Sequence, residues 1–283
     1  MSGRRQRDTL RTLLSNELIQ RYLHALGVTK REPSAAALTE LVPAHLSRVP
    51  FENVSKLYRR KHLGLTGLPN IELFLEGIEQ YHFGGTCYSN NFHFYTLLAS
   101  LGYQARLCGA DMSNPDVHMV IMVNVDGREY LVDGGYAAPL LSPMPRDLPE
   151  DYVVTLGRDR YVLRPQDTTG CSRLDLYRDG VLKHGYLAKP APKKIEDFSA
   201  VIADSFRPSA TFLNALLLAR FHGDRSVVIH NLSVIESRGS EATVRSMGNR
   251  EELIAEVEQQ FDIPGEVVSE AVSELHELVD AWG

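Results

Sequence analysis

The chain is poor in cysteine and tryptophan, with three cysteines and one tryptophan among 283 residues. Cys87, Cys108 and Cys171 form an odd set without zinc-type spacing, and no secretory leader is recognisable. An odd, scattered set of cysteines is typical of a protein kept in a reducing compartment. We therefore expect no disulfide, no metal site and a cytoplasmic location.

Long apolar runs and an excess of positive charge are also missing. Apolar runs such as 212–218 and 119–123 fall far short of the roughly 20 residues that span a bilayer, so no membrane partner is expected. The net charge of -6 argues against broad phosphate binding and thus against nucleic acid as a partner. Gly84 and Gly85 are not followed by Gly-Lys-Ser/Thr, which excludes a P-loop at that pair.

What the sequence does contain is an ordinary globular composition, 43% hydrophobic and 23% charged. Residues 1–103 show helical apolar spacing, with a helix predicted over 71–81 just before the Gly-Gly pair. From 104 to 195 the chain changes to short β-branched and aromatic runs. Asp-Gly pairs at 126–127 and 179–180 predict two hairpins there. This part is expected to be an antiparallel sheet closed into a barrel.

The last segment, 196–283, mixes both kinds of pattern. Helical spacing covers 198–221, a strand is expected at 227–235, and two amphipathic helices split at Pro264 are expected in 251–282. The fold class predicted from these patterns is α+β, in three segments: 1–103, 104–195 and 196–283.

Cys87 has the most informative position in the chain. It follows Gly84, Gly85 and Thr86 and precedes an apolar stretch, 92–101, that reads as a helix. A thiol just before a helix meets unpaired N–H groups and the positive end of the helix dipole, which favour the thiolate. The alternative is that Cys87 is a small buried hydrophobic residue, as isolated cysteines commonly are.

The first hairpin supplies a base and a carboxylate. If Asp126 and Gly127 form a two-residue type I′ turn, His118 and Asp133 become diagonal neighbours on one sheet face. A carboxylate on one imidazole nitrogen leaves the other free to take a proton. A three-residue loop with a bulge would instead place the two side chains on opposite faces. Taken singly, His118 could be a strand-end histidine and Asp133 a turn residue.

Cysteine, histidine and aspartate together are the set used for covalent acyl transfer. The set does not choose the acceptor of the acyl group. Water as acceptor would make the protein a hydrolase or protease, and an amine would make it an N-acyltransferase or amide synthase.

The sequence resembles the arylamine N-acetyltransferase family along nearly its whole length. The matching segments occur in family order and are specific as an ordered set. They read RYLHALGV, HLSRVPFENV, GGTCYSNN, SLGYQARL, VHMVIMVNVDGREYLVDGGYAAPL and RPSATFLNALLLAR.

The resemblance implies an N-terminal helical bundle, a central β-barrel and a C-terminal α/β lid, with a triad arranged as in cysteine proteases. It implies a ping-pong transfer of acetyl from acetyl-CoA, as co-substrate, to an arylamine, arylhydroxylamine or hydrazine. By position, Cys87 matches the nucleophile, His118 the base and Asp133 the third member. Phe51 and Tyr136 match residues that line the acceptor pocket.

Three residues near Cys87 depart from the family pattern: Phe83 stands where the family commonly has Arg, and Tyr88 and Ser89 replace an aromatic or Leu followed by Glu or Gln. These departures leave the substrates less defined than the triad. An amide synthase that closes macrolactams with the same triad, a cysteine hydrolase and a non-catalytic family member stay open as alternatives. The oligomeric state is not predicted.

Overall fold

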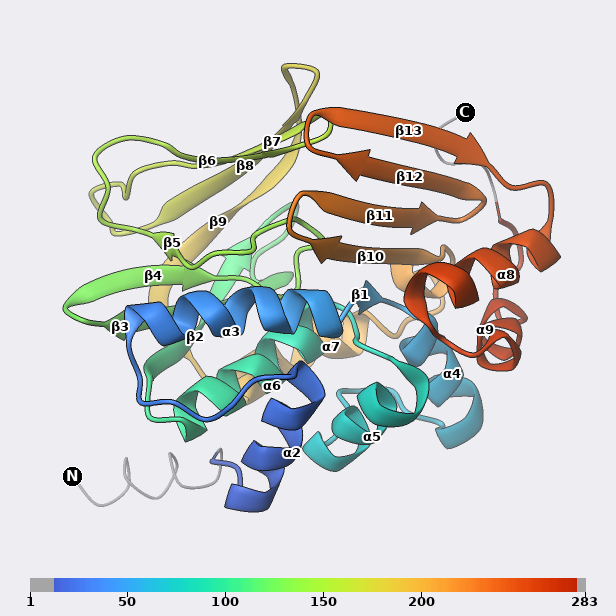
Figure 1. The fold of residues 1–283 in the computed structure, drawn as a ribbon, viewed down its shortest axis with the longest axis horizontal. Coiled ribbons are helices and arrows are strands. Elements are labelled where there is room, and N and C mark those ends of the chain that lie inside the picture. The colour runs from blue at the N-terminus through green and yellow to red at the C-terminus, as the bar shows by residue number, and fades with distance from the viewer. Residues whose placement is uncertain (1–12, 279–283) are drawn as a thin grey trace.

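The computed structural model describes residues 13–278, and helices form most of its first part (Figure 1). Ser34 and Asn70 accept N–H bonds at the starts of two of these helices, and Gly27 ends another in the left-handed conformation. The helix predicted over 71–81 is confirmed. The elements are α2 (Asn16–Leu26), α3 (Ala35–Arg48), β1 (Phe51–Glu52), α4 (Val54–Leu63), α5 (Ile71–Tyr81) and α6 (Cys87–Ser100).

An antiparallel eight-stranded sheet follows in the order β5-β4-β3-β2-β9-β8-β7-β6. Its edge strands β5 and β6 are not paired with each other, so the sheet is barrel-like without being closed by hydrogen bonds. Apolar side chains fill its concave side, including Val120, Met122 and Leu174. The strands are β2 (Gln104–Asp111), β3 (His118–Val125), β4 (Arg128–Val132), β5 (Met144–Pro145), β6 (Tyr152–Leu156), β7 (Asp159–Leu163), β8 (Ser172–Arg178) and β9 (Val181–Lys193).

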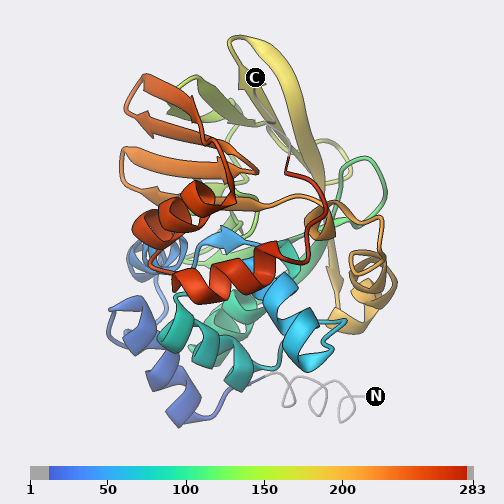
Figure 2. The same cartoon turned by 90° about the vertical axis from the view of Figure 1, so that its right-hand side faces the viewer.

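A second, five-stranded antiparallel sheet has the order β1-β10-β11-β12-β13. Helices α8 and α9 pack on it around Leu253, Phe261 and Val268 (Figures 1 and 2). The remaining elements are η1 (Ile195–Phe198), α7 (Ser199–Asp204), η2 (Thr211–Leu213), β10 (Leu217–His222), β11 (Arg225–His230), β12 (Ser233–Arg238), β13 (Glu241–Ser246), α8 (Arg250–Phe261) and α9 (Gly265–Val272).

Two expectations for this last part were wrong. The spacing over 198–221 predicted a helix, but 217–222 is strand β10, because it pairs with β1 (Phe51 opposite Ala219) and with β11. The single strand expected at 227–235 is two strands joined by a turn at Asn231. In both places pairing with distant segments overrides the local apolar period. The predicted split at Pro264 is confirmed, and Trp282 lies outside the described residues.

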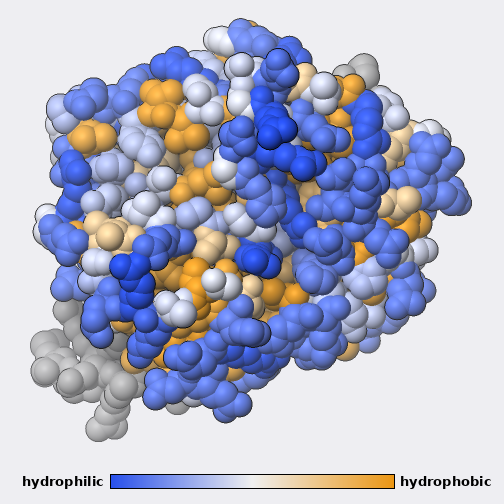
Figure 3. All heavy atoms as spheres, viewed as in Figure 1, coloured by the Kyte–Doolittle hydropathy of each residue, from blue (hydrophilic) through white to orange (hydrophobic). Residues whose placement is uncertain are grey.

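The surface seen in Figure 3 is mostly hydrophilic, with apolar side chains gathered near α3. Among residues 13–278, none of the helices has the length and apolar character needed to span a membrane.

Candidate active site

Two motifs about thirty residues apart in the sequence lie side by side. Phe51 forms a parallel bridge with Gly85, and the Gly85 N–H donates to the Pro50 carbonyl at 3.3 Å. A Cβ added at Gly84 would lie 1.9 Å from that same carbonyl oxygen. Only glycine allows this approach. The Gly-Gly pair therefore fixes the loop before Cys87 against the HLSRVPFENV segment.

Cys87 is the first residue of α6, with Thr86 as the N-cap. The helix thus begins five residues before the 92–101 stretch that predicted it, because the polar residues 87–91 pack into the interior instead of ending the helix. The residue is only 9% exposed. Its position at the positive end of a 14-residue helix agrees with the prediction.

The register of the first hairpin is confirmed. Asp126 and Gly127 have φ of 52° and 74°, as a type I′ turn requires, and Val125 pairs with Arg128. His118 and Asp133 consequently lie on one face. The Nε2 of His118 donates to Oδ2 of Asp133 at 2.8 Å. Cys87 also acts on the His118 imidazole and favours its protonated form, which raises the pKa of the ring.

The His118–Asp133 pair is almost completely buried, with side-chain exposures of 3% and 0%. Burial by itself lowers the pKa of His118, but the Asp133 carboxylate and Cys87 together raise it to about 10. Burial raises the pKa of Asp133, yet His118, Asn91 and the Gly135 N–H bring it below its ordinary value. The geometry therefore favours an ionic pair near neutral pH.

Asn91 holds this pair in place, and the sequence analysis missed it. Its Nδ2 donates to Oδ1 of Asp133 at 2.9 Å and to the Met119 carbonyl at 2.6 Å, and its Oδ1 accepts the Gly134 N–H at 2.8 Å. A signal was present in the sequence: Asn91 is four residues after Cys87, so the two share a helix face.

Gly135 lets the hairpin approach α6. A Cβ at this position would lie 2.7 Å from the Cys87 Cα and 2.9 Å from its carbonyl oxygen. Its N–H also donates to Oδ1 of Asp133 at 3.0 Å. Gly135 thus controls how closely Asp133 and Cys87 come together.

The two predicted pocket residues, Tyr136 and Phe51, pack against different aromatic side chains. Tyr136 packs against the His118 ring with centroids 5.4 Å apart, and its hydroxyl bonds to Nδ1 of His184 at 2.5 Å. Phe51 packs edge-on against Phe212 at 5.6 Å. Phe212, which sequence reasoning missed, belongs to η2 and brings an aromatic ring from the last segment to the site.

The three residues that depart from the family pattern, Phe83, Tyr88 and Ser89, are all buried. Phe83 is buried and lies under the guanidinium of Arg59, 5.4 Å from its ring centre. The Tyr88 hydroxyl donates to the Asp116 carbonyl at 3.3 Å. Ser89 is buried behind Cys87 on α6. Among the described residues, none of the three is a hydrogen-bond partner of His118.

All three cysteines are free thiols; Cys87 and Cys108 are buried and Cys171 is partly exposed. Within residues 13–278 no three His, Cys, Asp or Glu side chains are grouped so that they could hold a metal ion.

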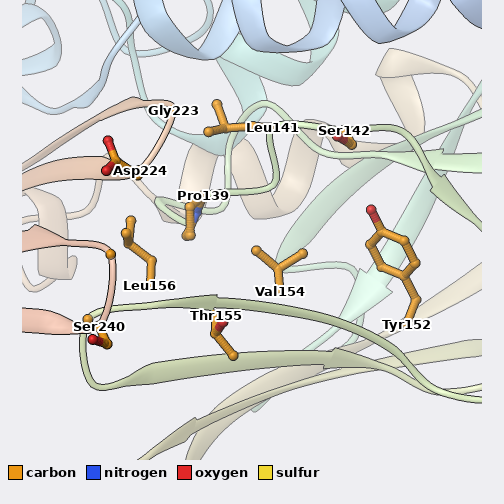
Figure 4. Close-up of a pocket in the computed structure, with 12 residues that line it drawn as sticks. Pro139, Leu141, Ser142, Tyr152, Val154, Thr155, Leu156, Gly223, Asp224 and Ser240 are labelled. Carbon is orange, nitrogen blue, oxygen red and sulfur yellow. The ribbon is translucent and has the colours of Figure 1, made fainter.

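A cleft of about 340 Å³ lies between the two sheets (Figure 4). Tyr152, Val154 and Leu156 of β6 line it, opposite the turns at Asp224 and Ser240. None of the five residues predicted for the site lines this cleft. Its walls are mostly apolar or hydroxyl-bearing, with the carboxylate of Asp224 and without a lysine or arginine.

Comparison with known proteins gives a consistent set of relatives. A family model described as N-acetyltransferase matches residues 34–268. An arylamine N-acetyltransferase of Gallus gallus, pineal gland isozyme NAT-3, is 31% identical over 146 residues, 48% of this chain and 49% of that protein. The match thus spans about half of that relative. Arylamine N-acetyltransferase 2 of Homo sapiens is 26% identical over 208 residues, 65% of this chain and 70% of the relative.

Solved structures share the fold. The arylamine N-acetyltransferase of Nocardia farcinica has a TM-score of 0.76 at 25% identity, over 89% of this chain and 92% of the other. That of Mycobacterium marinum, solved in complex with CoA, has a TM-score of 0.77 at 19% identity, over 93% of this chain and 100% of the other. The α+β class with a helical part and a barrel-like sheet agrees with the prediction.

Proposed function

This chain belongs to the arylamine N-acetyltransferase family, and on that premise we propose that it moves an acetyl group from acetyl-CoA to an arylamine, arylhydroxylamine or hydrazine. The observation that carries the proposal is the buried His118–Asp133 pair and its electrostatic link to Cys87. Asp133 accepts a hydrogen bond from one ring nitrogen at 2.8 Å, and Cys87 helps to raise the pKa of the same imidazole. This is the arrangement that activates a thiol as a nucleophile.

In the first half of the reaction the Cys87 sulfur attacks the acetyl carbonyl. A carbon–sulfur bond to Cys87 forms and the bond to the CoA sulfur breaks. His118 supplies the proton that the departing CoA thiol takes up. Asp133 keeps the imidazole oriented and stabilises its charged form, and Asn91 keeps Asp133 in place.

In the second half the amine nitrogen attacks the thioester of Cys87. The bond from carbon to Cys87 breaks, and His118 takes the proton that the amine loses. Phe51, Phe212 and Tyr136 supply aromatic surface against which an aryl ring can stack. Their placement supports an aromatic acceptor over an aliphatic one.

Intact-mass analysis tests this proposal. After exposure to acetyl-CoA the wild-type protein should gain the mass of one acetyl group, Cys108→Ala should gain it too, and Cys87→Ala should not. Addition of an arylamine should then remove the group and release the N-acetylated amine. Labelling that persists in Cys87→Ala would refute the role of this thiol, and loss to water at one rate with or without amine would make the protein a hydrolase.

Other expectations remain predictions. These are the cytoplasmic location, the lack of metal and nucleic-acid partners, and the division at 103/104 and 195/196. That the acceptor is an aromatic amine or hydrazine also remains a prediction.

A further inference from the structure

A small cavity lies at the N-terminus of α6, next to Cys87 in the sequence. Its walls come from α4, from residues 65–69, from the start of α6 and from the segment around α7 (Figure 1). The residues that matter are Lys56, Arg59, Thr86, Ser89 and Ser205. The cavity has a volume of about 30 Å³, and a single water needs roughly 10–15 Å³ by the same kind of measure. There is room for one small group, not for an organic substrate.

Two cations line this cavity without an ion-pair partner among the described residues. The Lys56 ammonium donates to the carbonyl and the hydroxyl of Ser205, at 2.6 and 2.9 Å, and lies 4.0 Å from the centre of the Phe206 ring. Arg59 is only 5% exposed, and its Nη2 donates to the Leu73 carbonyl at 2.8 Å. Burial lowers the pKa of Lys56 to about 8 and also lowers that of Arg59; the charges of Cys87 and Glu52, respectively, offset only part of this effect.

The nearest buried carboxylate, Glu52, does not neutralise these cations by contact. Its two oxygens accept the N–H groups of Ser55 and Gly84, at 2.7 and 3.0 Å. It acts on Arg59 only through space, and burial raises its own pKa. These two hydrogen bonds tie Glu52 to the loop before Cys87 and to the start of α4.

The third element is a hydroxyl without a partner. Ser89 is 6% exposed, lines the cavity, and its Oγ has no hydrogen-bond partner among the described residues. Thr86, the N-cap of α6, makes no side-chain capping bond, so the positive end of this 14-residue helix is not neutralised there. An unpaired buried hydroxyl costs free energy unless a ligand satisfies it.

We propose that this cavity binds a small oxyanion of the phosphate class, held by Lys56, Arg59 and the Ser89 hydroxyl at the N-terminus of α6. Helix N-termini with adjacent cations are suited to such anions. The volume admits a free phosphate ion or a single phosphoryl group of a larger molecule such as CoA. The site is separate from the acyl-transfer chemistry and does not depend on it.

Occupation of the cavity has a consequence for Cys87. The thiol is the first residue of the same helix, and Lys56 acts electrostatically on it. A bound anion would share the positive helix end with the Cys87 thiolate and disfavour it by like-charge repulsion. Phosphate should therefore slow alkylation of Cys87 while it stabilises the fold.

The test uses the full chain without acetyl-CoA or amine. Inorganic phosphate, compared with sodium chloride at equal ionic strength, should raise the Tm and give a saturable heat in titration calorimetry. Ser89→Ala, which removes a single oxygen, and Lys56→Met should each weaken binding by about tenfold or more. Lys56→Arg should retain binding, and Lys183→Met, an exposed lysine on β9, is the matched control.

Competition identifies the source of the group. If CoA displaces phosphate and dephospho-CoA does not, the 3′-phosphate of CoA occupies the cavity. If neither displaces it, free phosphate is the ligand. The proposal is overturned if phosphate has no effect beyond that of chloride, or if Ser89→Ala and Lys56→Met bind as the wild type does. Equal rates of Cys87 alkylation with and without bound phosphate would refute the coupling.

Discussion

The two sides of Cys87 differ in how completely their polar groups are paired. On the β3–β4 side, both oxygens of Asp133 are bonded, to His118, Asn91 and the Gly135 N–H, and the unpartnered group there, among the described residues, is the hydroxyl of Tyr186, whose ring packs on His118. On the α4 side, Lys56 and Arg59 have no ion-pair partner within 13–278, and the Ser89 hydroxyl has none of any kind there.

Buried polar groups can serve two different purposes, depending on whether they are hydrogen-bonded within the protein. A carboxylate bonded at both oxygens holds the His118 ring in one orientation, as the proposed proton transfer between Cys87 and His118 requires. A buried polar group without a hydrogen-bond partner lowers the free energy of unfolding, and a ligand that bonds to it can restore that free energy. The following changes test the paired side, from the largest expected effect to the smallest.

Asp133→Asn should have the largest effect. It keeps the shape of the side chain but removes the charge that stabilises the protonated imidazole, so kcat should fall by about 10⁴-fold. Steady-state kinetics with a chromogenic arylamine checks this. Asp147→Asn, which breaks an exposed pair with Arg128, is the control and should leave kcat unchanged. A comparable loss in both variants would contradict the role of Asp133.

The pH dependence of stability comes next. His118 has a pKa of about 10 in the folded chain and about 6.5 when unfolded, so the folded state holds the proton more tightly. This contribution is complete below pH 6.5 and is lost as pH rises toward 10, at up to about 1.4 kcal/mol per pH unit. The advantage of wild type over His118→Gln in urea unfolding should therefore shrink between pH 6 and pH 10. A histidine NMR titration with a midpoint near 6.5 would rule this out.

Asn91→Ala should cost about 3 kcal/mol of unfolding free energy, because it leaves the Met119 carbonyl and the Gly134 N–H buried and unpaired. The adjacent Asn90→Ala is the matched control. Asn90 donates only to the Pro50 carbonyl and its own Oδ1 is already unpaired, so the loss should be about 1 kcal/mol or less. Equal losses in denaturant unfolding would show that Asn91 has no special place in the network.

Gly135→Ala should have the smallest effect on stability, about 2 kcal/mol, because its Cβ would push on the Cys87 backbone. Its effect on Cys87 acetylation should exceed its effect on folding, since the hairpin moves away from α6. Gly67→Ala, where a Cβ meets nothing within 4 Å, should be neutral in both assays. Acetylation at the wild-type rate in Gly135→Ala would show that this close approach is not needed.

Much of the reactive set was predictable from local sequence. The Asp126-Gly127 turn decides the register, and the register puts His118 and Asp133 on one face. Asn91 was missed because its spacing to Cys87 matters only once the helix is known to begin at Cys87 and not at 92. Phe212 was missed because it reaches Phe51 only through the packing of η2.

The predicted helices and strands were wrong where a segment pairs with a distant part of the chain. The 217–222 strand reads as a helix by its apolar spacing, since nothing in its own sequence reveals β1 as its neighbour. The start of α6 was placed too late because Ser89, Asn90 and Asn91 are polar. A periodicity argument assumes that polar side chains face solvent, but tertiary contacts bury these three.

By itself the sequence determined the turns, the helix ends and the face on which the base and its carboxylate lie, because these depend on backbone preferences of a few adjacent residues. Only the tertiary structure decided that the hairpin with His118 and Asp133 packs on the Cys87 backbone, that Gly135 allows it, and that Lys56, Arg59 and the Ser89 hydroxyl gather at the start of α6. Such contacts join segments thirty or more residues apart, and their geometry follows from how all the elements pack together.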